Sequence, residues 1–86
     1  MAERKQVGVV RHYYNKIGVA AIDLSDGLKV GDKIVIEANE GPVEQVVSSM
    51  QIEHKAVAKA SAGQSVGMKV AARVREGDPV FKIVEG

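Results

Sequence analysis

Apolar and polar residues alternate along most of this 86-residue chain, as expected for β-strands with one buried face and one exposed face. The clearest alternation lies in residues 65–75. Its apolar positions are Val66, Met68, Val70, Ala72 and Val74, and its basic positions are Lys69, Arg73 and Arg75. This pattern predicts a strand over residues 65–75 that has an apolar inner face and a basic outer face.

Five further strands are predicted in the same way. They cover residues 6–14, 17–24, 34–38, 43–54 and 80–84, and the first two are joined around Asn15 and Lys16 as a hairpin. Residues 53–60 are rich in helix formers, but a helix of about 8 residues does not stand on propensity alone. We therefore expect a loop there.

Three predicted strands begin after the same short motif, in which a glycine is followed by a polar residue, any residue and an aliphatic residue. The copies are Gly31-Asp32-Lys33-Ile34, Gly63-Gln64-Ser65-Val66 and Gly77-Asp78-Pro79-Val80. Glycine takes left-handed turns without steric cost, so each copy indicates a turn into a new strand. The chain is therefore expected to be one all-β domain over residues 1–86, a small closed antiparallel β-barrel of six strands.

The composition limits the location and chemistry of this domain. The chain has no cysteine, an amino terminus without the apolar stretch of a signal peptide, and no apolar run long enough to span a membrane. We therefore expect a cytoplasmic protein without a membrane association. The net charge is only +1, but residues 45–75 hold five bases against the single acid Glu53. The five are Lys55, Lys59, Lys69, Arg73 and Arg75.

The sequence does not contain a recognisable catalytic, metal or nucleotide motif. No glycine-rich loop ends in Lys-Ser or Lys-Thr, and His12 and His54 are far apart and have no nearby cysteine. Ser48 and Ser49 lack a glycine-flanked elbow. Tyr13 and Tyr14 fit either base stacking or coverage of one barrel end. We expect no enzyme activity, no metal and no cofactor.

Four segments resemble the second domain of translational GTPases, the β-barrel of elongation factor Tu and its relatives. They are Gly27–Ile34 in the sequence Gly-Leu-Lys-Val-Gly-Asp-Lys-Ile, Val47–His54, Ala60–Gly67 and Arg75–Val80, in the order of that family. The segment from Ser49 to Lys55 also resembles the accessory barrel at the carboxyl end of some collagenase-like peptidases.

The first resemblance implies a site for the aminoacylated end of tRNA. The matching positions are Gln51, Ile52, Glu53, Ser65, Val66 and Gly67. This chain departs from the family at three of them: Gln51 replaces a usual Glu, Glu53 a frequent His or Phe, and Ser65 an Asn. The GTPase domain is absent from the sequence.

Two functions therefore remain open. The first is a non-catalytic module that binds tRNA, rRNA or a ribonucleoprotein through the five bases named above. The alternative is a protein-interaction or accessory module that acts with a separately encoded enzyme, as the second resemblance implies. Salt dependence separates them, because binding to phosphates weakens steeply with salt.

Overall fold

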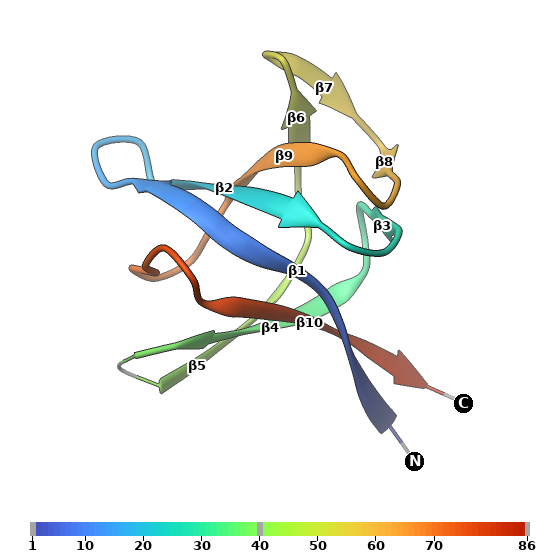
Figure 1. The fold of residues 1–86 in the computed structure, drawn as a ribbon. Helices are drawn as coiled ribbons and strands as arrows, with labels where there is room; N and C mark the ends of the chain where they lie inside the picture. The colour runs from blue at the N-terminus through green and yellow to red at the C-terminus, as the bar shows by residue number, and fades with distance from the viewer. Residues whose placement is uncertain (1, 40, 86) are drawn as a thin grey trace.

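A computed structural model describes residues 2–39 and 41–85, in which ten strands form an all-β fold (Figure 1). The strands are β1 (Ala2–Tyr14), β2 (Val19–Leu24), β3 (Leu28–Lys29), β4 (Lys33–Ala38), β5 (Gly41–Val46), β6 (Met50–Ile52), β7 (Lys55–Val57), β8 (Lys59–Ala60), β9 (Ser65–Lys69) and β10 (Pro79–Glu85). Eight of them form one antiparallel sheet in the order β5-β4-β10-β1-β2-β9-β6-β7, and β3 pairs with β8. The all-β prediction is confirmed. Within the same residues, no helix is long and apolar enough to cross a bilayer.

The predicted closed barrel is wrong, because the sheet of the described residues is open, with β5 and β7 as its edges. A side chain links β5 to the segment after β9 in place of a backbone ladder. The Gln45 amide donates to the carbonyl oxygen of Lys69 at 2.9 Å, and its oxygen accepts from the Ala71 N–H at 2.8 Å. Backbone groups that strand pairing would otherwise satisfy are therefore satisfied by one glutamine.

The long strand β1 belongs to both halves of the sheet. Residues 2–9 pair with β10 and residues 8–14 pair with β2, and the register shifts once in each ladder. Such bulges bend a strand and increase its twist. Figure 1 shows the result, in which β1 runs between β10 and β2 as the sheet curls.

The curled sheet encloses a core of aliphatic side chains. Ala20, Ile22, Ile34, Ile36 and Val80 have no exposed surface, and no polar side chain of the described residues is buried. Met50 and Met68 lie opposite each other across β6 and β9 and are each only 1% exposed. The scarcity of aromatic residues is thus offset by close packing of branched aliphatics and methionine.

Several strand bounds differ from the predictions. The strand predicted over residues 65–75 ends at Lys69, so Arg73 and Arg75 lie in a loop and Ala72 is exposed. Residues 43–54 are split into β5 and β6 by the segment 47–49. Residues 53–60, predicted as a loop, contain the short strands β7 and β8. Apolar residues continue at every second position through Val70, Ala72 and Val74, but the backbone pairing of β9 ends at Lys69.

A turn after β2 is held by an ion pair. Asp26 accepts a hydrogen bond from the Gly27 N–H at 2.7 Å and contacts the Lys5 ammonium group of β1. Lys5 first, and the Gly27 N–H second, lower the pKa of the Asp26 carboxyl below its usual value of 3.8. The pair thereby connects the start of β1 to the far end of β2.

Gly8 of β1 lies directly against β2. A Cβ atom at this position would lie 2.7 Å from the Asp23 carbonyl oxygen and 2.9 Å from Ile22 Cγ2. The backbone oxygen cannot move away without breaking the strand ladder. Only glycine fits here without a shift of β2.

Gly8→Ala should therefore lower the free energy of unfolding by about 1–3 kcal/mol, the usual cost of overpacking. Urea unfolding followed by circular dichroism measures this change. Gly27→Ala is the matched control, because its Cβ would meet nothing nearer than 3.7 Å. Equal stability of the two variants would contradict the close approach at Gly8.

Candidate functional site

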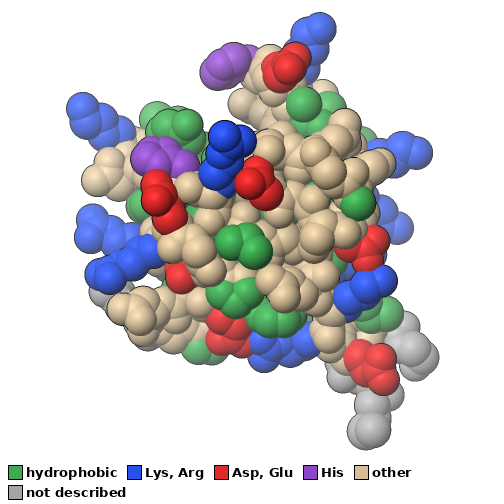
Figure 2. All heavy atoms as spheres, viewed as in Figure 1, with side chains coloured by type: hydrophobic (Ala, Val, Ile, Leu, Met, Phe, Trp, Pro, Cys, Tyr) green, Lys and Arg blue, Asp and Glu red, His purple; other side chains and the backbone are tan. Residues whose placement is uncertain are grey.

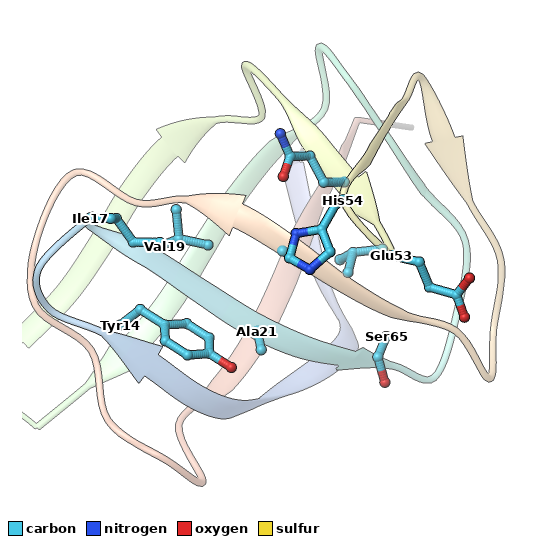
Figure 3. Close-up of a pocket in the computed structure, with 10 residues that line it drawn as sticks. Tyr14, Ile17, Val19, Ala21, Glu53, His54 and Ser65 are labelled. Atoms are coloured by element: carbon cyan, nitrogen blue, oxygen red, sulfur yellow. The ribbon is translucent and has the colours of Figure 1, made fainter.

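A cavity of about 360 Å³ lies on the outer surface of β2 and β9, between the β1–β2 hairpin and the β6–β7 turn (Figure 3). Its size falls at the small end of the range of about 300–1,000 Å³ for ligand sites. The lining residues are Tyr14, Ile17, Val19, Ala21, Gln51, Glu53, His54, Ser65, Val66 and Gly67. Three segments distant in sequence thus meet at one site.

The floor of the cavity is hollow because two small residues are neighbours in the sheet. Ala21 lies opposite Gly67, and Gly67 lies opposite Gln51, so the three residues form one row across β2, β9 and β6. Successive side chains of a strand point to opposite faces. Val66 and Met68 accordingly fill the core while Gly67 leaves space outside.

One wall is apolar and comes from the β1–β2 hairpin. Tyr14 pairs with Val19 across a four-residue loop in which the Ile17 and Gly18 N–H groups donate to the Tyr14 carbonyl. Tyr14 is 49% exposed and Ile17 is 62% exposed, so the two side chains present apolar surface at the edge of the cavity. The Tyr14 ring packs edge-on against His12, with 4.4 Å between ring centroids.

The opposite wall is polar and comes from the two-residue turn between β6 and β7. Ile52 pairs with Lys55, so Glu53 and His54 are the turn residues, with φ angles of 50° and 66°. These are the left-handed angles of a type I′ turn, which favours Asn-Gly. Glu takes them only with strain, whereas His is one of the residues that adopt them more readily. Figure 3 shows the His54 imidazole over β9 and the Tyr14 ring beside the edge of β2 that faces away from β9.

The end of the cavity near Ser65 carries a carboxylate. The Ser65 hydroxyl donates to Asp23 Oδ1 at 2.5 Å, and Asp23 lies opposite Ser65 in the β2–β9 ladder. Arg11 Nη1 lies 3.8 Å from the same oxygen atom. A nucleophilic serine is normally paired with a basic imidazole. Ser65 instead has a carboxylate partner, so its hydroxyl belongs to a polar rim.

Five of the six residues predicted from the translation-factor resemblance line this cavity. Gln51, Glu53 and Ser65 contribute exposed side chains, while Val66 is buried and borders the cavity alongside Gly67. Ile52 does not line it, because its partly buried side chain packs against the core. The predicted positions are therefore brought together, apart from Ile52.

The five predicted RNA-binding bases lie outside the cavity lining. Lys55 is in β7, Lys59 in β8 and Lys69 at the end of β9, while Arg73 and Arg75 lie in the loop that follows. On the face in Figure 2, lysine and arginine side chains are scattered and acidic side chains lie between them. No group of His, Asp or Glu residues in the described chain could hold a metal ion.

Sequence analysis considered Tyr14 for base stacking and His54 for a metal site, but it did not place the apolar wall or His54 in this cavity. Ile17, Val19 and Ala21 read simply as strand residues, and only the register of β2 against β9 places them beside Gly67. The sequence pattern also does not indicate that the side chains of Tyr14 and Ile17 are exposed. A signal was present in the tip of the hairpin, where an isoleucine stands beside Asn15 and Lys16.

Comparison with curated proteins places this chain beside part of two longer proteases. It is 47% identical over 81 residues to an uncharacterized protease of Methanocaldococcus jannaschii and 32% identical over 82 residues to a collagenase of Porphyromonas gingivalis. Both alignments cover 93% of this chain but only 20% and 23% of the relatives. The chain therefore spans about a fifth of their length. No protein-family model matches it.

Solved structures show the same fold. The C-terminal domain of a putative U32 peptidase from Geobacillus thermoleovorans superposes with a TM-score of 0.84 at 21% identity, and 91% of each chain is covered. Its selenomethionine variant gives 0.83 at 20% identity, with 88% of this chain and 96% of that chain covered. These findings support the resemblance to an accessory domain of collagenase-like peptidases. They do not support identification with the second domain of translational GTPases.

The strained β6–β7 turn gives a direct test of this geometry. Replacing Glu53 with Asn and His54 with Gly supplies the residues that a type I′ turn favours, so the free energy of unfolding should rise by about 1–2 kcal/mol. Urea unfolding measures this gain. The double alanine variant at these positions is the control, because alanine does not relieve a left-handed backbone. An Asn-Gly variant no more stable than wild type would argue against the turn.

Proposed function

We propose that this chain is a non-catalytic accessory module that binds polypeptide for a peptidase-type catalytic domain. The observation that carries the proposal is the alignment of nearly the whole chain with about a fifth of two proteins named as a protease and a collagenase. The other four fifths of each relative leave ample length for a separate catalytic domain.

The cavity supports polypeptide as the ligand. Ligand sites are mostly apolar with a few placed polar groups, and this one has Tyr14, Ile17 and Val19 on one side and Gln51 and His54 on the other. Exposed large apolar groups at the rim of a hollow are typical of protein-interaction sites. The Ser65 hydroxyl donates to the Asp23 carboxylate and not to an imidazole, and this supports a binding role for the cavity.

RNA binding is the competing prediction, and the charges around the cavity do not favour it. Glu53 lines the cavity and Asp23 lies beside Ser65, so an approaching phosphate would meet two carboxylates. The five basic residues lie outside the lining and are divided among β7, β8, β9 and a loop. A phosphate-binding surface needs such charges to be concentrated.

A binding assay with two ligands decides between these functions. We expect fluorescently labelled gelatin to bind the 86-residue chain with an affinity that changes less than about threefold between about 50 and 200 mM salt, because apolar contacts are not screened. We expect tRNA to bind weakly and to be released by salt. Tight tRNA binding together with no gelatin binding would overturn the proposal.

Two variants locate the surface in the same assay. Tyr14→Ser with Ile17→Ser removes the apolar wall at exposed positions and should abolish gelatin binding without unfolding the chain. Lys69→Glu with Arg73→Glu alters the basic residues outside the cavity and should leave gelatin binding unchanged. The reverse pattern would contradict polypeptide binding in the cavity.

A further inference from the structure

We propose that the cavity selects a short sequence feature in an extended peptide, namely a large apolar side chain next to a lysine or arginine. This inference rests on the proposed function and adds the class of side chains that the module recognises. The apolar side chain would occupy the hollow between Tyr14 and His54, and the cationic side chain would face Glu53 and Asp23.

The hollow suits one large apolar side chain. Its floor is formed by Ala21 and Gly67, which face each other across β2 and β9 and present almost no side-chain volume. A Cβ atom at Gly67 would lie 3.5 Å from Val19 Cγ1, which is an ordinary contact distance. Glycine is therefore not required here by the fold, and its effect is to keep the floor of the cavity open.

The apolar wall offers exposed surface that such a side chain can contact. Ile17 stands at the tip of the β1–β2 hairpin, and the Tyr14 ring packs edge-on against His12. A second hollow of about 230 Å³ lies beside the same hairpin and shares Tyr14 and Ile17 as lining residues. The two residues thus form a ridge that a bound side chain would contact from the cavity side.

The charge of the cavity determines which side chain is accepted next to the apolar residue of the bound peptide. The charged lining residue is Glu53, and no ion pair in residues 2–39 and 41–85 involves it. Asp23 adds a second carboxylate behind Ser65, partly offset by Arg11 at 3.8 Å. A cationic side chain is attracted to this end and an acidic side chain is repelled.

The β6–β7 turn presents Glu53 and His54 to the cavity, and the left-handed backbone of Glu53 is strained. An Asn-Gly sequence would make the same turn without strain, but it would remove both side chains from the lining. Strained residues of this kind are concentrated at ligand-binding positions. The turn is therefore consistent with a direct role of both side chains in recognition.

Isothermal titration of the 86-residue chain with four capped peptides tests this inference. The peptides carry Phe-Arg, Phe-Glu, Gly-Arg or Gly-Glu at the centre and glycine elsewhere. We expect Phe-Arg to bind about fivefold more tightly than Phe-Glu, as for an exposed ion pair. It should bind about tenfold more tightly than Gly-Arg, because a phenyl group is partly buried.

Four variants assign these preferences to residues. Glu53→Gln should remove most of the preference for Arg over Glu, whereas Glu44→Gln in β5, away from the cavity, should retain it. Gly67→Val fills the hollow and should remove the preference for Phe over Gly, with circular dichroism as the check of folding. Tyr14→Ala serves the same purpose at an exposed position if Gly67→Val does not fold.

The outcomes separate this inference from the proposed function. Equal affinities for Phe-Arg and Phe-Glu, or an unchanged preference in Glu53→Gln, would overturn the selectivity while gelatin binding could persist. Failure of gelatin and of all four peptides to bind would overturn both.

Discussion

The bend of β1 is the constraint on which the rest of this structure depends. Its first half pairs with β10 and its second half with β2, and the two register shifts let one strand serve both directions. Gly8 lies at this bend, where β2 leaves no room for a Cβ atom. Because β1 bends there, the open sheet curls far enough to enclose an aliphatic core.

The same curvature sets up the cavity. β2 pairs with the second half of β1 and places Ala21 on the outer surface of the sheet. In the ladder with β9, Ala21 lies opposite Gly67. The hairpin that ends β1 and begins β2 then supplies the apolar wall, and β6 extends the row with Gln51. The floor and one wall of the candidate site thus depend on strands that the core requires, while the other wall is a short turn at the edge of the sheet.

Much of the fold could be predicted from the sequence because a half-buried strand leaves a period of two. The strands at 19–24 and 65–69 follow this pattern closely, whereas three consecutive residues of β4, Ile34, Val35 and Ile36, are all buried. The pattern failed at residues 70–75, where Val70 and Val74 are buried without a strand. It also could not reveal that the Gln45 side chain would link β5 to this segment, because such a contact joins residues far apart in sequence.

The candidate site could be predicted in part. The resemblance to the translation-factor barrel located Gln51, Glu53, Ser65, Val66 and Gly67, which the structure brings together. It did not locate Tyr14, Ile17, Val19 or Ala21. These residues line the cavity only because of the register of the β1–β2 hairpin and of β2 against β9, and the resemblance does not specify that register. The accompanying function was also less well supported than the alternative, since five bases that are close in sequence are divided among several elements.

An NMR titration of the isotopically labelled chain with unlabelled gelatin fragments tests the central claim most directly. The account predicts localised amide shifts in residues 14–21, 51–54 and 65–67, the three segments that line the cavity. Shifts confined to Lys55, Lys59 and the loop with Arg73 and Arg75 would contradict it and would place the binding surface outside the cavity.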